Sequence, residues 1–361
     1  MRITFLLPCD NLTGGARVVA VHARELMALG HEVLVVTCAP DAPSWRERLR
    51  GVFKGQGRAA PTPPTAGHIA LSGVPHKVMP RPGPITAADV PDADVIVATW
   101  WETAVWMHAL PASKGRRVHL IQGYEVWLGP QHVPQVHAAL RLPNTKIAIS
   151  RDLRQTIESA LGPLGITVVP NAVDPRQFDA PPRVRNAQPT VGFVYAQAAI
   201  KGADICARAC ELARERLPGL RVLAFGTDAP SPQVPLPEGT TYFHRPAQDR
   251  LREHYAACDV WLFGSRLDSF GLPILEAMAC RTPVIAVPIG AAPDLLAGGA
   301  GCIVPSESPQ AMADAILRLC TQAEADWQRQ SDLAHATAQG YTWREAAQRI
   351  VTLLERPPSG G

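Results

Sequence analysis

Two carboxylates with a glycine between them are the residues of this sequence best suited to do chemistry. Asp268 and Glu276 are separated by seven residues, and Gly271 between them is followed by Leu272 and a proline. Proline fits the first turn of a helix, where its missing N–H costs nothing, so we expect a helix to begin here with its free amides pointing outward. Such a corner binds phosphate, and glycine lets the anion approach the backbone. The pattern indicates a phosphorylated ligand whose hydroxyls lie between two acids.

Two strands are expected to hold this corner in place. Short apolar runs at 259–263 and 283–287 are typical of buried strands, so the segment between them must be a loop that turns into a helix. Glu276 also has a purely structural interpretation, because any carboxylate near a helix N-terminus is stabilised by roughly 0.3–1 kcal/mol. The second acid and the anion site beside it favour a functional role.

The stretch resembles the signature of the retaining glycosyltransferases of family four, which have the GT-B fold. The resemblance rests on an acid, seven residues and Glu276, with Phe-Gly-Leu-Pro inside and Glu-Ala-Met-Ala-Cys at the end. It implies that Glu276 holds the ribose hydroxyls of a nucleotide sugar, that Asp268 contacts the sugar, and that the amides of Gly271 and Leu272 hold the diphosphate. The family usually has glutamate where this chain has Asp268, and the shorter side chain bears on the identity of the sugar more than on the type of reaction.

Two positions bear on how the negative charge of the leaving group is stabilised: one holds a lysine that matches the family, and the other lacks the family's arginine. Lys201 with the glycine after it matches the family's Lys-Gly, whose ammonium neutralises the departing diphosphate. The family also has arginine where this chain has Phe193, just after the glycine of the strand expected at 190–194. Arg245 or Arg266 is expected to supply this charge instead. An uncompensated loss would weaken leaving-group stabilisation, which is worth up to several kcal/mol.

The first part of the chain shows the pattern of a parallel α/β sheet: a strand at 3–7, a glycine loop, a helix at 16–29 and a strand at 32–37. Gly14 and Gly15 at the helix start are by themselves typical of a turn. The run Gly-Gly-Ala-Arg-Val-Val, with Gly-His-Glu-Val downstream, is similar to the opening of the same family, which implies that the two glycines face the donor. After the strand expected at 118–122, many members have a histidine where this chain has Gln122. Gln-x-x-Glu at this point resembles a subset of bacterial cell-surface glycan transferases, including enzymes thought to use deoxysugar donors.

These inferences give one set of site residues. The expected catalytic residues are Lys201, Asp268 and Glu276, and the expected donor-binding residues are Gly14, Gly15, Gln122, Lys201, Arg245, Ser265, Asp268, Phe270, Gly271, Leu272 and Glu276.

Aromatic residues follow two strands of the first part of the chain. Trp100 and Trp101 come after a strand at 94–99, and ligands of open α/β sheets bind at the carboxyl edge. These tryptophans either stack on a sugar or lipid or cap the core. Tyr124, Glu125 and Trp127 are either acceptor contacts or structural residues. Residues 42–90 are expected to form a loop-rich surface excursion, with short strands around positions 69 and 78.

The expected organisation is α/β with the GT-B fold, in which two Rossmann-like parallel-sheet domains face each other across a cleft. Residues 1–172 form the acceptor-side domain, 173–339 the nucleotide-sugar-binding domain, and 340–361 a helix that packs back on the first domain. The run Pro-Asn-Ala-Val-Asp-Pro resembles the family's hinge, with Ala172 in place of glycine. A hinge here lets two lobes close on the donor and exclude water.

Composition excludes several classes of protein. The net charge of +3 is too small for a nucleic-acid partner, and no apolar run is long enough to span a bilayer. The eight cysteines lack a Cys-x-x-Cys pair, which favours buried thiols in a reducing cytoplasm over disulfides or a metal site. We therefore expect a cytoplasmic protein without a metal or other cofactor. A local basic patch remains compatible with peripheral contact at the inner membrane face.

The leading hypothesis is a bacterial, retaining, metal-independent glycosyltransferase. It transfers a hexose or deoxyhexose from a nucleoside diphosphate donor to a glycan, lipid-linked or small-molecule acceptor in cell-surface polysaccharide biosynthesis. No general base stands out, which fits the family view that the leaving phosphate takes the acceptor proton. A degenerate member that binds nucleotide sugar or glycan without turnover is the alternative, and an epimerase or phosphorylase is a third hypothesis. A dehydrogenase is disfavoured, because no Gly-x-Gly-x-x-Gly follows the first strand.

Overall fold

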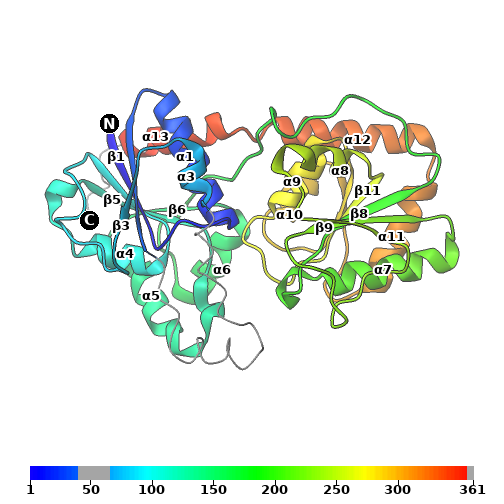
Figure 1. Cartoon of the computed structure of the whole chain (residues 1–361), viewed down its shortest axis with the longest axis horizontal. Coiled ribbons are helices and arrows are strands. Elements are labelled where there is room, and N and C mark those ends of the chain that lie inside the picture. Colours follow the sequence, from blue (N-terminus) through cyan, green and yellow to red (C-terminus); the bar gives the residue numbers. More distant parts are fainter. Residues whose placement is uncertain (40–65, 356–361) are drawn as a thin grey trace, which may run out of the picture. The chain divides into compact units, whose positions relative to one another are not determined.

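The computed structural model describes residues 1–39 and 66–355, and these fold into two compact units (Figure 1). The first unit contains Met1–Ala148, Ile157–Val169 and the chain from Ala347, and the second contains Ile149–Thr156 and Pro170–Ala346. The expected domain limits, at 172/173 and 339/340, stay predictions. Residues 42–65 of the expected loop-rich excursion lie outside the described residues.

The first unit is built on a parallel sheet of seven strands in the order β3-β2-β1-β4-β5-β6-β7. The chain adds strands on one side of β1 and then continues on the other side from β4, so the strand order reverses between β1 and β4. Ligands of open parallel sheets bind at such a reversal, outside the carboxyl ends of the strands. The strands are β1 Arg2–Leu7, β2 Glu32–Cys38, β3 His76–Met79, β4 Val95–Ala98, β5 Arg116–Ile121, β6 Thr145–Ala148 and β7 Thr167–Val168.

Helices cover this sheet because its strands are apolar on both faces. Side chains from β1, β2 and β4 form a core with α4 and α5, in which Leu6, Ile96 and Met107 are fully buried. Helices α6 and α13 each contribute residues to both units. The helices and 3₁₀ turns described in this part are α1 Gly14–Ala28, α3 His68–Ser72, α4 Trp101–His108, η1 Ala112–Lys114, η2 Glu125–Leu128, η3 Pro130–His132, α5 Val133–Arg141, α6 Arg151–Leu161 and α13 Trp343–Glu355.

The short strand expected around position 69 is wrong, because these residues form helix α3. Its first turn is held by a residue far away in the sequence: the Asp10 carboxylate accepts hydrogen bonds from the amides of Ile69 and Ala70, each at 3.0 Å. A carboxylate at this position satisfies amides that have no partner within the helix. The strand expected around position 78 is confirmed as β3.

The second unit contains a parallel sheet of six strands in the order β10-β9-β8-β11-β12-β13. Its strand order reverses between β8 and β11. The strands expected at 190–194, 259–263 and 283–287 are confirmed as β8, β11 and β12. The strands of this sheet are β8 Thr190–Val194, β9 Arg221–Gly226, β10 Thr241–His244, β11 Val260–Phe263, β12 Val284–Ala286 and β13 Gly301–Ile303.

Two layers of helices enclose this sheet, with α7 and α11 side by side on one face and α8, α9 and α12 on the other (Figure 1). A 3₁₀ turn that ends at Lys201 precedes α7, and Gly202 between them has a left-handed conformation with φ of +62°. The helices and turns are η4 Ala199–Lys201, α7 Ala203–Arg216, η5 Gln248–Arg250, α8 Leu251–Ala256, α9 Leu272–Ala279, α10 Ala292–Leu296, α11 Pro309–Thr321 and α12 Glu324–Gln339.

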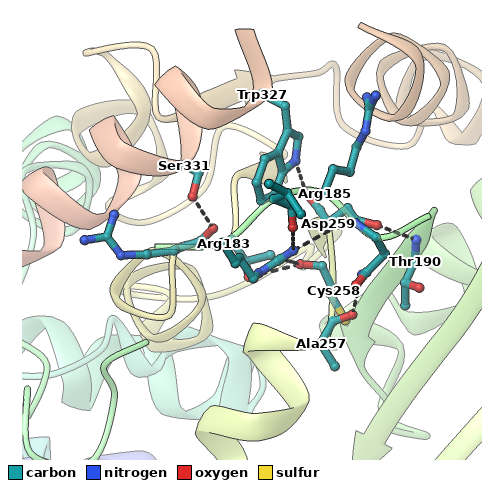
Figure 2. Close-up of polar contacts among 12 residues, drawn as sticks. Arg183, Arg185, Thr190, Ala257, Cys258, Asp259, Trp327 and Ser331 are labelled. Carbon is teal, nitrogen blue, oxygen red and sulfur yellow. Dashed lines mark hydrogen bonds and ion pairs between the residues drawn. The ribbon is translucent and has the colours of Figure 1, made fainter. Parts of the chain in front are cut away.

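The segment that leads into β8 is fixed by arginines (Figure 2). Arg183 lies 3.2 Å from the fully buried carboxylate of Asp259 and 4.7 Å above the ring of Trp327, whose indole N–H donates to the Asp259 carbonyl at 2.9 Å. The other carboxylate oxygen of Asp259 accepts from the Thr190 amide at 2.9 Å. Asp259 precedes β11 and Thr190 begins β8, so this network lies at the opposite end of the strands from their carboxyl edge.

All eight cysteines are free thiols, as expected, and six of them are buried. Burial disfavours the thiolate and raises the pKa of Cys206 and of Cys320 to about 12. Cys206 and Cys210 both lie on the buried face of α7. Among the described helices, none combines the length and the apolar character that a membrane crossing requires.

Candidate functional site

The strand reversal of the second unit brings three loops together at the carboxyl edge of its sheet. They are residues 195–202 after β8, 264–271 after β11 and 287–291 after β12. The first two loops touch through their backbones, because a Cβ atom at Gly202 would lie 1.8 Å from the Gly264 carbonyl oxygen. Only glycine permits this approach, and it places Lys201 next to the residues that follow β11.

The third loop holds the other side of the same segment. Gly290 has φ of +64°, and a Cβ atom there would lie 2.9 Å from the Phe270 carbonyl oxygen. The Ala291 amide donates a hydrogen bond to that oxygen at 2.9 Å. The Phe270 side chain is buried and points away from solvent. Residues 265–271 are therefore fixed between two neighbouring loops.

Lys201 and Asp268 form an ion pair at this edge. Lys201 Nζ lies 3.0 Å from Asp268 Oδ2, and the side chains are 43% and 18% exposed, respectively. The other oxygen of Asp268 accepts hydrogen bonds from the amides of Phe270, at 3.1 Å, and Gly271, at 2.8 Å. The structure thus brings together Lys201, Asp268 and the Gly271 amide of the expected site. The Asp268 carboxylate contacts both of the other groups.

Helix α9 begins at Leu272, one residue before the proline that was expected to start it. Gly271 stands at its N-cap with φ of +88°, a conformation that favours glycine. The amides of the first turn of a helix have no partner within the helix, and the helix dipole favours an anion there. This corner has the geometry of an anion site.

Glu276 lies inside α9 and is only 5% exposed. Tyr255, on α8, donates a hydrogen bond of 2.7 Å to Glu276 Oε2. The sequence did not identify Tyr255, because it lies 21 positions away on another helix and no local pattern connects the two residues. Its role follows from the packing of α8 against α9.

The remaining residues expected in this unit have different environments. Ser265 is buried, and its hydroxyl lies 3.4 Å from the Lys201 carbonyl oxygen, so it links the two loops. Arg266 forms ion pairs with Asp204, at 2.8 Å, and Glu307, at 2.7 Å, which raise the pKa of its guanidinium. Its charge is therefore largely neutralised.

Arg245 is exposed at the end of β10, the edge strand of the sheet, which is separated from β8 by β9. Its Nε atom donates to the Thr227 carbonyl at 3.1 Å. Lys201, in contrast, pairs directly with Asp268 in the loop at 264–271. The roles expected for Arg245 and Arg266 stay predictions.

The first unit places three expected donor-binding residues at the carboxyl edge of its own sheet. Gly14 and Gly15 begin α1, and Gln122 follows β5. A Cβ atom at Gly15 would lie 3.7 Å from the amide nitrogen and the amide oxygen of Gln122, so these two residues are neighbours. Gln122 Oε1 is buried and has no hydrogen-bond partner among the described residues.

Aromatic side chains gather around the end of β4 in the same unit. The rings of Trp100 and Trp127 meet edge to face with centroids 6.2 Å apart, and Trp127 is 54% exposed. Tyr124 and His137 stack and share a hydrogen bond of 2.7 Å between the phenol oxygen and Nε2. Aromatic faces of this kind can pack against the apolar face of a sugar ring.

Glu125 lies within this aromatic region but is 1% exposed. Burial raises the pKa of its carboxyl to about 8, so the group is mostly protonated at neutral pH. Its Oε2 atom has no hydrogen-bond partner in the part of the chain that the structure describes. Across the ranges 1–39 and 66–355, no three His, Cys, Asp or Glu side chains are grouped so that they could hold a metal ion.

Two family models match this chain, one for each part. "Glycosyltransferase Family 4" matches residues 12–177 and "Glycosyl transferases group 1" matches residues 188–322. The chain is 31% identical over 186 residues to D-inositol 3-phosphate glycosyltransferase of Mycobacteroides abscessus, which covers 48% of this chain and 40% of that protein. The protein of the same name from Kineococcus radiotolerans is 30% identical over 263 residues, or 63% of this chain and 59% of that protein. The matches thus span 40–59% of the length of these relatives.

The structure is similar to that of Anabaena Alr3699/HepE in complex with UDP and glucose. The TM-score is 0.73 at 19% sequence identity, over 99% of this chain and 100% of that chain. At this identity the likeness establishes the fold.

Proposed function

Because this chain belongs to the family 4 glycosyltransferases and has the GT-B fold, we propose that it is a retaining glycosyltransferase that transfers a sugar from a nucleoside diphosphate donor to an acceptor hydroxyl. The observation that carries this proposal is the position of Lys201 beside the glycine corner that begins α9. A cation and helix amides together suit a diphosphate.

In the proposed reaction, the bond between the anomeric carbon and the diphosphate oxygen breaks, and the electron pair leaves with the diphosphate. Lys201 and the amides of the first turn of α9 stabilise the negative charge that develops on it. The acceptor oxygen forms its bond on the face from which the diphosphate departs, and its proton passes to a phosphate oxygen. The sugar therefore keeps its anomeric configuration.

Glu276 is proposed to accept hydrogen bonds from the ribose hydroxyls of the donor. Support comes from its position on the first turns of α9, close to the corner that would hold the diphosphate. Tyr255 acts through Glu276 by fixing the orientation of its carboxylate. Asp268 is proposed to contact the sugar that is transferred.

We further propose that the transfer requires no metal, because the Lys201 ammonium supplies positive charge where the diphosphate leaves. Activity that persists in excess chelator would agree with this, and activity that returns only with added Mg²⁺ or Mn²⁺ would contradict it. The acceptor is proposed to be a glycan, a lipid-linked sugar or a small hydroxylated molecule, with the Trp100–Trp127 pair as its aromatic contact. A cytoplasmic location with peripheral membrane contact remains part of the proposal.

The first test is a thermal-shift panel with UDP, GDP, dTDP, ADP and CMP on the wild type and on Glu276→Ala. A ligand at a hundred times its dissociation constant stabilises a folded protein by about 2.7 kcal/mol. We expect one nucleoside diphosphate to raise the melting temperature of the wild type and to lose this effect in the variant. A panel without any shift in the wild type would contradict the donor assignment.

A member that binds without turnover is the second candidate. Two features favour this second candidate. Phe193 stands in place of the family's arginine, and the Asp268 carboxylate already accepts the hydrogen bond of the Gly271 amide. Incubation with the identified donor and a panel of acceptors, followed by mass spectrometry, separates the two functions. A glycosylated product excludes the binding-only function, whereas nucleotide binding without any product, including hydrolysis of the donor, supports it.

A further inference from the structure

The Asp268 carboxylate contacts two of the groups that are expected to hold the donor diphosphate, the Lys201 ammonium and the Gly271 amide. Its Oδ2 atom lies 3.0 Å from Lys201 Nζ, and its Oδ1 atom accepts the Gly271 amide at 2.8 Å and the Phe270 amide at 3.1 Å. A backbone N–H makes one well-aligned hydrogen bond. A phosphate oxygen can therefore reach the Gly271 amide only when Asp268 has moved away.

The length of this side chain matters for the contact. Aspartate readily hydrogen-bonds the backbone two residues further on, since its short side chain closes this turn without strain. Glutamate, which the resembling family usually has at this position, is not among the residues that form such turns. The departure from the family pattern at Asp268 thus coincides with a carboxylate that turns back onto its own loop.

The negative charge of Asp268 also opposes the binding of a diphosphate. A carboxylate 3.0 Å from Lys201 offsets the positive charge that would attract a diphosphate, and it would repel the phosphate oxygens that approach the same corner. The Lys201 side chain is 43% exposed, so water screens the ion pair and the pair can exchange partners at modest cost.

We propose that Asp268 is an internal competitor of the donor diphosphate. In the empty site its carboxylate occupies the Lys201 ammonium and the Gly271 amide, and it rotates away when a nucleoside diphosphate binds. The freed carboxylate can then contact the transferred sugar. This inference rests on the proposed function and adds that Asp268 weakens the binding of the nucleoside diphosphate product, which favours its release.

The test measures nucleoside diphosphate affinity by titration calorimetry, with UDP, GDP, dTDP and ADP as the probes. Asp268→Asn keeps an oxygen for the two amides but removes the charge, and we expect it to bind its diphosphate about tenfold more tightly than the wild type, or about 1.4 kcal/mol. Lys201→Met should bind more weakly. In the Lys201→Met background, Asp268→Asn should raise the affinity for the diphosphate much less, because carboxylate and diphosphate no longer compete for the ammonium.

Asp314→Asn is the matched control. Asp314 lies on α11 and pairs with Arg216 at 3.0 Å, so the variant removes the same charge from the same unit without changing the corner. It should bind the diphosphate as the wild type does. Asp268→Ser, whose hydroxyl can also accept an amide hydrogen, provides a second uncharged variant, and a thermal melt of each variant verifies folding.

The outcomes separate this inference from the proposed function. If the wild type binds a nucleoside diphosphate and neither folded variant of Asp268 binds it more tightly, the inference is wrong and the donor site stands. If neither the wild type nor any variant binds any of the four probes, both are wrong. An equal gain in Asp314→Asn would show a general effect of net charge and would also overturn the inference.

Discussion

The phenol of Tyr255 on α8 donates a hydrogen bond of 2.7 Å to Glu276 Oε2 on α9, and both side chains are buried. A buried carboxylate that receives this bond is held in one orientation. Since Glu276 is the residue proposed to bind the ribose, the precision of that contact depends on a neighbour that does not touch the donor.

Tyr255→Phe is therefore expected to weaken nucleoside diphosphate binding about fivefold, because a hydrogen bond of this kind contributes about 1 kcal/mol. Calorimetric titration measures the change. The control is Tyr242→Phe, which removes a phenol on β10 that donates to the Asp228 carbonyl. Equal losses in both variants would mean that Tyr255 acts through general stability.

Replacement of Lys201 tests the charge that is proposed to stabilise the leaving group. Lys201→Met should lower kcat by about a hundredfold to a thousandfold, as for other groups aimed at charge that develops in the transition state. The melting temperature should change little, since the Lys201–Asp268 pair is partly exposed. Arg216→Met removes an exposed cation that is also paired with an aspartate and should leave kcat unchanged. An active Lys201→Met enzyme would contradict the proposed mechanism.

The close contact between Gly202 and Gly264 can be tested by a substitution that adds a single methyl group. Gly202→Ala places a Cβ atom 1.8 Å from the Gly264 carbonyl oxygen at a φ of +62°, so the two loops must separate. We expect a loss of about 3 kcal/mol in the free energy of unfolding, measured with denaturant, together with weaker diphosphate binding. Gly219→Ala, where the added atom has no neighbour within 4 Å, should cost far less.

The buried carboxyl of Glu125 should make the free energy of unfolding depend on pH. Burial raises its pKa in the folded state from 4.5 to about 8, so the unfolded chain releases this proton at a lower pH than the folded chain does. The group therefore destabilises the fold increasingly as pH rises from about 4.5 to 8 and by a constant amount above that range. Below pH 4.5 both states are protonated and the effect vanishes.

Glu125→Gln should accordingly be more stable than the wild type at pH 7, by on the order of 3 kcal/mol, and equally stable at pH 4. Denaturant unfolding at a series of pH values measures the difference. A difference that does not depend on pH would show that Glu125 does not titrate in this way.

The network of Figure 2 predicts the largest effect on folding. Arg183→Met leaves the fully buried Asp259 carboxylate without its cation, which should cost about 3–5 kcal/mol. Arg329→Met removes an exposed arginine that pairs with Asp326 on the surface of α12, and it should change the free energy of unfolding by less than about 1 kcal/mol. Similar losses in the two variants would contradict the role assigned to Arg183.

Local patterns in the sequence predicted most strands and the corner at Gly271. Runs of apolar residues predicted β8, β11 and β12, and the run Gly-Leu-Pro predicted the start of α9 to within one residue. These features depend on neighbours in the chain, through short continuous runs of apolar residues and the restricted φ of proline. The same local reasoning predicted a strand around Ile69 and was wrong, because the capping carboxylate of Asp10 is 59 positions away.

Only the tertiary structure decided what the site residues touch. The strand order places the loops after β8 and β11 side by side, and this neighbourhood pairs Lys201 with Asp268 over a separation of 67 positions. Tyr255 beside Glu276, and Arg266 between two acids, follow from packing in the same way. Partners of this kind are invisible in the sequence, because hydrogen bonds and ion pairs depend on distance in space and carry no periodic trace along the chain.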